Sequence, residues 1–422
     1  MTFEDSEAFA RGLDAADLLA RFREAFFIPA GPEGTPCVYL AGNSLGLQPR
    51  KARGYVAEAL EAWATLGVEG HVQGAHPWLP YHELLTASTA RLVGAQPEEV
   101  VVMNSLTVNL HLMMASFYRP TPRRFRVLME ADAFPSDRYA VASQARFHGY
   151  APEAAVVEVP PRPGEDALRA DDLLAAIERE GPKLALVLLG NVNYLTGQAF
   201  DVEAVTRAAH AAGALVGFDL AHGAGNLRLR LHDDGPDFAV WCSYKYLNGG
   251  PGSLGGVFVH ARHRDGHALP RFEGWWGHDK ASRFQMPARF VSLPGAEGWQ
   301  LSNPPILQLA ALRASMELFA EAGMGALEEK RERLSSFLAF LLAGLPRGAV
   351  RLMTPLDPKQ RGAQLSLKVR KEARTLVQRL GQAGFVVDFR APDVVRAAPV
   401  PLYNSFMDVW RFARALRSYV AS

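Results

Sequence analysis

Short apolar runs alternate with longer helical patterns between about residue 98 and residue 260. The runs are rich in aliphatic and β-branched side chains, whereas the segments between them repeat apolar residues at the spacing of amphipathic helices. Strands that are apolar throughout and separated by helices indicate a mainly parallel sheet with both faces covered. We predict strands over residues 100–103, 126–129, 184–189, 214–218, 238–242 and 256–259.

The C-terminal third has a different pattern, in which strand-like segments alternate between apolar and polar residues. This alternation is typical of a sheet with one solvated face. Near the N-terminus, residues 6–26 have a helical pattern, and a second helix is expected from Pro49 to Gly67. The elements expected in the C-terminal third are a long helix interrupted near Gly323, a strand, a helix, a strand and a closing helix, over residues 306–342, 364–369, 371–383, 385–388 and 406–420.

Chain length and these two patterns together predict two domains. At roughly 150 residues per domain, the 422 residues of the chain suffice for two or three compact units. We predict a large α/β domain over residues 46–303. Residues 1–45 and 304–422 are expected to form a smaller α+β domain, with Asn404 as the N-cap of its closing helix.

Composition and charge exclude several classes of protein. The 45 basic and 44 acidic side chains leave a net charge of +1, which argues against nucleic acid or a membrane surface as an electrostatic partner. Hydrophobic residues make up 49% of the chain, so disorder is excluded as the dominant state. No apolar run approaches the roughly 20 residues of a transmembrane helix. The acidic N-terminus shows no secretion signal, and we expect a cytoplasmic protein.

Two scarce residue types restrict the chemistry. Cys37 and Cys242 cannot build a disulfide scaffold or a Cys-rich metal site, and no metal site is predicted. Only eight of the 45 basic residues are lysines. Seven of these lie in charged, helical, alternating or turn contexts that favour solvent exposure, namely Lys51, Lys183, Lys280, Lys330, Lys359, Lys368 and Lys371.

Lys245 lies in a different context, between a buried strand and a glycine-dense loop. Residues 241–250 read Trp-Cys-Ser-Tyr-Lys-Tyr-Leu-Asn-Gly-Gly. This position is at the carboxyl end of the predicted sheet, where open α/β sheets bind their ligands. Burial lowers the pKa of a lysine, and the neutral amine can then form a Schiff base. A lysine that extends from a strand end to solvent is the alternative, and the local context leaves both open.

Two further groups precede Lys245 in the chain. Asp219 ends a strand and is followed by His222, and a carboxylate there could keep a pyridinium nitrogen protonated, as pyridoxal phosphate (PLP) requires. Ser105 and Thr107 lie at a helix start, where N–H groups and hydroxyls can bind a phosphate. Capping and core hydrogen bonding explain each group equally well when it is taken singly. Their order along the chain is that of the fold type I PLP enzymes.

Longer motifs make the sequence resemble the kynureninase family over nearly the whole chain. The most distinctive are Gly-Trp-Trp-Gly-His at residues 274–278 and the run from Arg396 to Phe406, whereas Asp-x-x-His and Tyr-Lys are shared more widely in the fold. The resemblance implies a fold type I, aspartate-aminotransferase-like large domain with a mainly parallel seven-stranded sheet, and PLP as cofactor. The other segments that carry it are residues 39–49, 104–111, 133–137, 195–198, 219–222, 244–248 and 302–306.

The resemblance also implies roles for individual residues. Lys245 would hold PLP and move protons, and Tyr244 would bind the phosphate and act as a second catalytic group. Arg396 would bind the substrate α-carboxylate, because a guanidinium matches a carboxylate in two parallel hydrogen bonds. The other expected cofactor contacts are Leu106, Thr107, Phe134, Pro135, Ser136, Asp137, Asp219, His222, Trp275 and Asn303, and the other expected substrate contacts are Ser44, His71 and Asn303.

The activity that the resemblance implies is hydrolytic cleavage of L-kynurenine to anthranilate and L-alanine, in tryptophan breakdown or NAD precursor synthesis. The sequence leaves open whether 3-hydroxy-L-kynurenine is also cleaved. A homodimer with shared active sites is expected, in which Trp275 and Asn303 reach the site of the neighbouring subunit.

Three alternatives differ in the residues that they need. A cysteine desulfurase-like lyase needs a nucleophilic cysteine on a mobile loop, whereas Cys242 lies in a strand and Cys37 in an extended segment. A dehydrogenase needs a Gly-x-Gly-x-x-Gly fingerprint after its first strand, and the sequence has none followed by an acid at the right distance. An inactive protein of the same fold is disfavoured, because Lys245, Asp219 and Arg396 are all present.

Overall fold

The computed structural model describes residues 2–264, 269–346 and 348–421. Its largest element is a seven-stranded sheet in the order β4-β10-β9-β8-β7-β5-β6. Neighbouring strands run parallel, except that β10 is antiparallel to β4 and to β9. The prediction of a mainly parallel seven-stranded sheet is therefore confirmed. The strands are β4 (Val100–Met103), β5 (Arg126–Glu130), β6 (Val156–Val159), β7 (Leu184–Gly190), β8 (Leu215–Asp219), β9 (Phe238–Cys242) and β10 (Gly255–Val259).

Six of these strands lie where the apolar runs predict them, and β6 is the one that the runs do not reveal. β6 lies at the edge of the sheet and pairs only with β5. Glu158 in it is exposed, and Val156 and Val157 are half-buried. Because an edge strand is less covered than a central one, its apolar signal is too short to separate from the preceding helix α6 (Pro152–Ala155).

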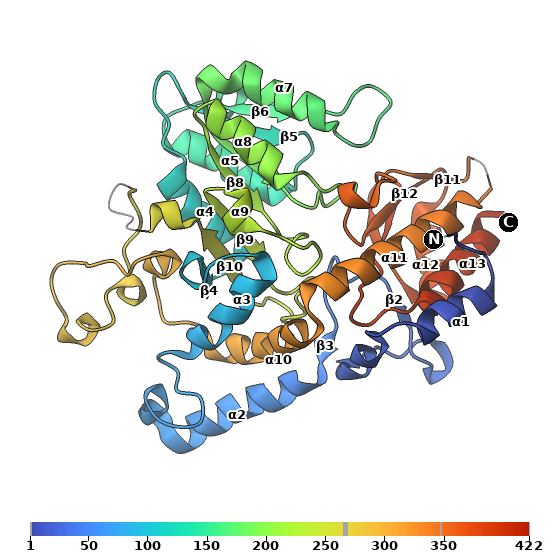
Figure 1. Ribbon diagram of the computed structural model, residues 1–422, viewed down its shortest axis with the longest axis horizontal. Coiled ribbons are helices and arrows are strands. Elements are labelled where there is room, and N and C mark those ends of the chain that lie inside the picture. Colours follow the sequence, from blue (N-terminus) through green and yellow to red (C-terminus); the bar gives the residue numbers. More distant parts are fainter. Residues whose placement is uncertain (1, 265–268, 347, 422) are drawn as a thin grey trace.

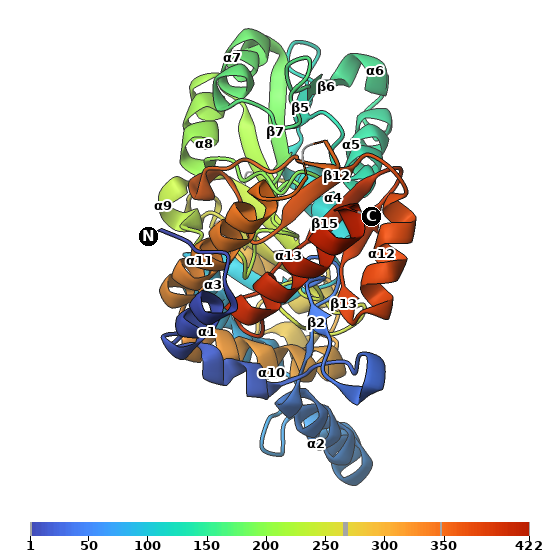
Figure 2. The same cartoon turned by 90° about the vertical axis from the view of Figure 1, so that its right-hand side faces the viewer.

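Helices cover both faces of the large sheet, as Figure 2 shows with α7 and α8 on one side of β7 and α5 on the other. Neighbouring residues of one strand belong to separate cores, with Val187 in the first and Leu186 in the second. This double burial explains why the central strands are apolar throughout. The first core includes α7 (Ala170–Glu180) and α8 (Val202–Ala211), and the second includes α4 (Leu106–Phe117) and α5 (Pro135–Phe147).

Helix α10 (Ile306–Ala322) belongs to the core of the large domain. Its residues Leu309 and Met316 are buried in the same core as Phe218 of the sheet. We therefore propose that the domain boundary on this side lies near Gly323, between α10 and α11, and not at residue 304. The other helices of the large domain are α2 (Arg50–Leu66), which agrees with the predicted bounds and projects from the body (Figure 1), α3 (Thr86–Val93) and α9 (Leu231–Asp234).

The smaller domain combines both ends of the chain. Its antiparallel sheet has the order β11-β12-β15-β14, and β2 pairs with β13 in a separate parallel pair. The predicted strand over residues 385–388 is therefore two strands that belong to different sheets. The elements are α1 (Glu7–Ala15), β1 (Phe26–Phe27), β2 (Val38–Tyr39), β3 (Gln48–Pro49), α11 (Met324–Ala343), β11 (Val350–Leu352), β12 (Leu365–Val369), α12 (Ala373–Gln382), β13 (Phe385–Val386), β14 (Asp388–Arg390), β15 (Val394–Ala397) and α13 (Phe406–Ala421). No helix of the described residues is both long and apolar enough to cross a bilayer.

The N-terminal helix is shorter than predicted, because Asp17 forms a turn. Its Oδ1 accepts the N–H of Leu19 at 3.0 Å, a local bond that competes with helical hydrogen bonding. Its Oδ2 lies 2.7 Å from Nζ of Lys330. The expectation that Lys330 is exposed is wrong, since its side chain is only 6% exposed and joins α11 to the N-terminal segment.

The closing helix α13 is capped by a residue of the N-terminal helix. Asp14 accepts the N–H of Phe406 at Oδ1 (2.6 Å) and that of Met407 at Oδ2 (3.1 Å). The predicted cap, Asn404, is wrong: its Oδ1 accepts the N–H of Val400 at 2.7 Å, upstream of the helix. Ser405 is the local cap, since its Oγ accepts the N–H of Asp408 at 3.0 Å, and the Asp14 carboxylate adds acceptors from a distant segment that no local pattern reveals.

We predict that Asp14→Ala lowers the free energy of unfolding by about 1–2 kcal/mol, because two N–H groups at the start of α13 lose their acceptor. Chemical denaturation measures this change. Glu7→Ala, which removes an exposed acid of the same helix paired only with Arg11, is the matched control and should cost less than about 0.5 kcal/mol. Equal losses in the two variants would contradict the capping role.

Candidate active site

Lys245 follows β9 directly, in a loop held against the N-terminal part of the chain. The N–H of Gly46 donates to the Tyr244 carbonyl at 2.8 Å, and the Asn248 N–H donates to the Lys245 carbonyl at 3.0 Å. A Cβ at position 46 would collide with that carbonyl and with Oδ1 of Asn248, so only glycine fits there. The close approach of these two segments fixes the position of the lysine.

A cavity with about 300 Å³ of empty volume lies beside Lys245. It opens at the carboxyl ends of the parallel strands, because Glu130, Gly190 and Asp219 end three of them. Figure 1 shows the smaller domain beside this part of the molecule. The cavity is lined by Glu130, Phe134, Asp137, Gly190, Val192, Tyr194, Asp219, Ala221, His222 and Lys245. The structure therefore brings five of the predicted site residues together around one cavity.

Three buried carboxyl groups surround this cavity. Burial, and then the charge of Asp219, raise the pKa of Asp137 well above its usual range. Burial also raises the pKa of Asp219, and the charge of Lys245 opposes that effect. Burial raises the pKa of Glu130 to about 8. Carboxyl groups this close together do not all ionise, because they share protons. One negative charge can therefore lie close to Lys245 without the cost of burying three negative charges together.

Two buried polar atoms of the cavity indicate a ligand. Oδ1 of Asp137 and Nδ1 of His222 have no hydrogen-bond partner among the described residues. Buried polar atoms are rarely left unpaired in a folded protein. Burial, and next the charge of Lys245, lower the pKa of His222 well below its usual range, so its imidazole is neutral at pH 7.

These features fit PLP, the cofactor that the sequence resemblance implies. Nζ of Lys245 lies 5.7 Å from the centroid of the Phe134 ring, so an aromatic face and an amine border the same space. The Thr107 and Ser136 hydroxyls are 2.9 Å apart, and they come from the first turns of α4 and α5. Helix N-termini with hydroxyl groups suit a phosphate. The predicted contacts Leu106 and Pro135 are the first residues of these two helices.

The predicted substrate residues Arg396 and Ser44 lie together next to this cavity. Nη1 of Arg396 donates to the carbonyl of Tyr194 at 2.6 Å, and Tyr194 lines the cavity. Nη2 of Arg396 donates to Oγ of Ser44 at 3.3 Å. Arg396 is on β15 of the smaller domain, so the two domains meet at this arginine.

Among the predicted site residues that do not line the cavity, Trp275, Asn303 and His71 have no contact that connects them to it in their own chain among the described residues. Trp275 lies in a 3-10 turn, where its Nε1 donates to the Arg283 carbonyl at 3.2 Å and 41% of the residue is exposed. Asn303 is exposed in the segment before α10. His71 follows α2, and its ring packs edge-on against Trp78 with centroids 5.1 Å apart. Their roles at an active site stay predictions that need a second chain.

Curated relatives of the chain are similar over its full length. The kynureninase of Myxococcus xanthus (strain DK1622) is 69% identical over 417 residues, which are 99% of this chain and 98% of that protein. The chain belongs to the kynureninase family. The kynureninase of Koribacter versatilis (strain Ellin345) is 56% identical and covers 98% of this chain and 97% of its own. A family model described as kynureninase C-terminal domain matches residues 327–416.

Solved structures of other proteins have a fold similar to that of this kynureninase-family chain. A variant of C-DES with glycine covalently linked to its PLP cofactor has a TM-score of 0.75 at 18% identity, over 90% of this chain and 96% of that one. The apo cysteine desulfurase from Thermococcus onnurineus NA1 has a TM-score of 0.72 at 19% identity, over 91% of this chain and 95% of that one. These structures establish the fold type I architecture.

Sequence reasoning missed three residues of this site. Glu130 accepts the Gly190 N–H at both oxygens (3.2 and 3.3 Å) and could have been found, because it follows a predicted strand at the same sheet edge as Asp219. Tyr194 lies in a loop with no pattern of its own. Asp388, which pairs with Arg396, is the first residue of the short strand β14, whose sequence suggests no special role.

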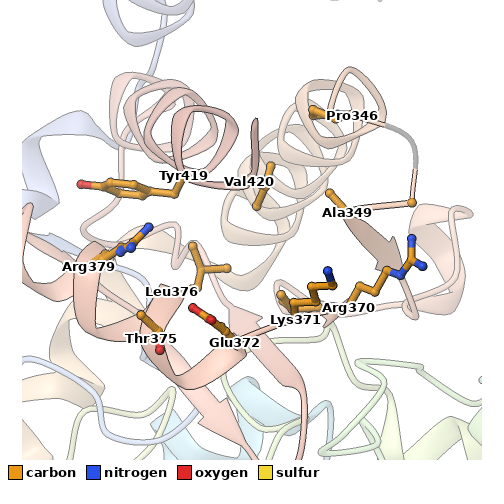
Figure 3. Close-up of a pocket in the computed structure, with 12 residues that line it drawn as sticks. Pro346, Ala349, Arg370, Lys371, Glu372, Thr375, Leu376, Arg379, Tyr419 and Val420 are labelled. Carbon is orange, nitrogen blue, oxygen red and sulfur yellow. The ribbon is translucent and has the colours of Figure 1, made fainter. Parts of the chain in front are cut away.

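A second hollow lies on the smaller domain and is separate from the Lys245 cavity. Figure 3 shows Arg379 and Tyr419 on one side of it and Arg370 and Lys371 on the other, with Leu376 between them. None of the residues that line it surrounds Lys245. It presents basic side chains beside the exposed acid Glu372, and it shares no residue with the Lys245 cavity.

We predict that Glu130→Gln makes unfolding of the cofactor-free protein less dependent on pH. The native pKa of about 8 lies above the ordinary value of 4.5, so the native carboxyl keeps its proton. Its contribution to stability is full below pH 4.5 and is lost as the pH rises through 8, at up to about 1.4 kcal/mol per pH unit. Urea denaturation at pH 5, 6.5 and 8 measures the free energy of unfolding of the variant and of the wild type. The difference between the two should shift in favour of the variant as the pH rises.

The matched control for this prediction is Glu153→Gln, since Glu153 is an exposed acid of α6. This variant should follow the wild type across the same pH range. A Glu130→Gln protein whose stability runs parallel to the wild type at all three pH values would show that the native carboxyl is ionised.

Proposed function

We propose that this chain cleaves L-kynurenine by hydrolysis to anthranilate and L-alanine, with PLP bound covalently to Lys245. The observation that carries the proposal is the cavity in which Lys245, Asp219, His222 and Phe134 meet, within a chain of the kynureninase family. The reaction belongs to tryptophan breakdown, where it releases an aromatic acid and an amino acid. The residues around the cavity supply what such a reaction needs.

Bound PLP supplies an electron-accepting ring that stabilises negative charge on the carbon atoms of the substrate. Asp219 stabilises a proton at the ring nitrogen, because its buried carboxylate gains most from a positive partner. Lys245 is the group that takes the proton from the α-carbon and returns it. Phe134 would present an aromatic face to the bound ring.

Tyr244 is the proposed acid for the hydrolytic step. Burial raises the pKa of its hydroxyl above the ordinary value, so the group keeps its proton at neutral pH and can donate it. Tyr244 and Lys245 are adjacent, and Nζ of Lys245 lies 5.7 Å from the Tyr244 ring centroid. Lys245 is thus proposed for the proton of the α-carbon, and Tyr244 for proton donation in the hydrolytic step.

We further propose that the protein acts as a homodimer with shared sites. Trp275, Asn303 and His71 would then reach the cavity of the partner, which they do not reach in their own chain. Apolar side chains are exposed on α2 and in the segment around Trp275, as expected of surface that another chain covers. They are Leu60, Trp63, Val68, Val72, Phe272, Phe284 and Met286. The cytoplasmic location stays a prediction.

A cysteine desulfurase-like activity is the second candidate, because solved cysteine desulfurases share the fold. That chemistry needs a cysteine thiolate at the site. Burial raises the pKa of both Cys37 and Cys242, and Cys242 is enclosed in β9. Neither thiol is therefore suited to attack a substrate, and kynurenine hydrolysis is the better supported function. Comparison of kcat/KM for kynurenine and 3-hydroxykynurenine decides the preferred substrate.

We predict that Lys245→Ala lowers kcat for kynurenine hydrolysis by roughly 10³-fold or more, because the cofactor linkage and the proton carrier are lost together. Anthranilate fluorescence measures turnover. The yellow absorption band of the wild type, which borohydride should bleach, tests the linkage independently. Lys183→Ala removes an exposed lysine and should leave both readouts unchanged. Wild-type turnover by Lys245→Ala would refute the assignment.

We predict that Lys245→Ala and Trp275→Ala subunits restore activity when they are mixed and refolded together. Each variant alone should be nearly inactive. If Trp275 completes the partner's site, each mixed dimer has one intact site, and statistical mixing gives about a quarter of wild-type activity. If Trp275 serves its own subunit, no activity returns. A mixture of Lys245→Ala with wild type is the refolding control and should retain about half of the wild-type activity whether or not subunits exchange.

A further inference from the structure

The guanidinium of Arg396 is already paired with a carboxylate of the same chain, that of Asp388. Nε of Arg396 donates to Oδ1 of Asp388 at 3.1 Å, and Nη2 lies 2.9 Å from Oδ2. This is the two-point arrangement that a guanidinium makes with any carboxylate. The Arg396 side chain is only 1% exposed, so it has little access to water. Asp388 therefore takes the place that the carboxylate of an amino acid substrate would need.

The remaining contacts of Arg396 leave few donors for a ligand. Nη1 donates to the Tyr194 carbonyl and Nη2 to Oγ of Ser44. Ser44 in turn donates to Oδ2 of Asp388. A substrate carboxylate can form two parallel bonds with Arg396 only where Asp388 gives way.

A second arginine, Arg390, also contacts Asp388. Nε of Arg390 is 3.2 Å from Oδ1 of Asp388, and Nη2 of Arg390 donates to Oδ2 at 3.3 Å. The Arg390 side chain is 41% exposed, so it can move more freely than Arg396. Asp388 thus bridges a buried arginine at the cavity and a more exposed one near the surface.

We propose that Asp388 is a displaceable counter-ion. The α-carboxylate of the substrate replaces Asp388 at Arg396, and Asp388 stays paired with Arg390. The inference rests on the proposed function, in which Arg396 receives that carboxylate. Without substrate, the three side chains carry one net positive charge. With substrate bound, the added carboxylate brings the group to neutrality, and both arginines remain paired.

The exchange makes the site selective for carboxylates. A buried arginine left without an anion is strongly unfavourable, and Asp388 removes that cost while the site is empty. A ligand gains from displacing Asp388 only if it brings its own negative charge. A neutral amide cannot compensate the arginine and is rejected. Asp388 therefore acts as a specificity-determining residue that touches Arg396 and lowers the affinity for every ligand that it competes with.

Binding of L-alanine and of L-alaninamide to the holoenzyme tests this exchange without requiring turnover. The two probes differ in the carboxylate alone, and the absorption change of the cofactor reports their Kd values. We expect Asp388→Asn to tighten L-alanine binding by about tenfold, because the competitor loses its charge. Binding of L-alaninamide should change less than about twofold in the same variant.

Arg390→Gln is the matched second variant, and its exposed position makes it safe for folding. It should weaken L-alanine binding several-fold, because a displaced Asp388 then has no second arginine with which to stay paired. In the Asp388→Asn background the same substitution should have no effect, since nothing remains to be displaced.

Three results would overturn the exchange. Weaker or unchanged L-alanine binding by Asp388→Asn would make Asp388 a group that only orients Arg396. An Arg390→Gln effect that persists in the double variant would make Arg390 a direct ligand. Failure of L-alanine to bind any variant would remove Arg396 from carboxylate recognition. Absence of kynurenine cleavage by wild-type protein that binds L-alanine as expected would instead defeat the proposed function alone.

Discussion

The placement of one half-buried lysine beside three buried carboxyl groups is the constraint on which the candidate site depends. Strands that are apolar on both faces leave no place for these charges except the carboxyl edge of the sheet. At that edge Asp219, Asp137 and Glu130 compete for protons, and Lys245 provides the opposing charge. The surrounding elements, including the Gly46 contact with the lysine loop, keep these groups close while water is excluded. A reactive environment therefore results from ordinary packing around an unusual set of charges.

The central sheet could be predicted from the sequence because its signal is local and redundant. Each inner strand is buried on both faces, so its apolar run stands out. β6 could not be predicted because its apolar signal is weak at the edge of the sheet. The division of residues 385–388 into two strands could not be predicted because the partner of β13, β2, is distant in sequence. The cap of α13 shows the same limit: Asp14 is nearly four hundred residues from Phe406, and no local pattern links them. Lys330 looked exposed for the same reason, since its partner Asp17 lies at the other end of the chain.

The residues of the candidate site also differ in whether a local pattern in the sequence could predict them. Asp219 and Lys245 could be predicted, because both follow strands whose carboxyl ends meet at one edge. Arg396 and Ser44 were found through the family resemblance, and their contact needs the three-dimensional structure. Asp388 carries no signal of its own, since an acid at the end of a short strand is common. It is important only because Arg390 and Arg396 both contact its carboxylate.

The pairing of both chain ends in the smaller domain has a consequence for biosynthesis. β2 emerges early from the ribosome, but its partner β13 and the helix that Asp14 caps are among the last segments to be made. The large domain can form while translation continues, whereas the N-terminal segment must wait until its partners β13 and α13 have been made. Ser44 meets Arg396 only at that moment. A truncated translation product would therefore contain a complete sheet and lysine loop but no means to recognise an amino acid.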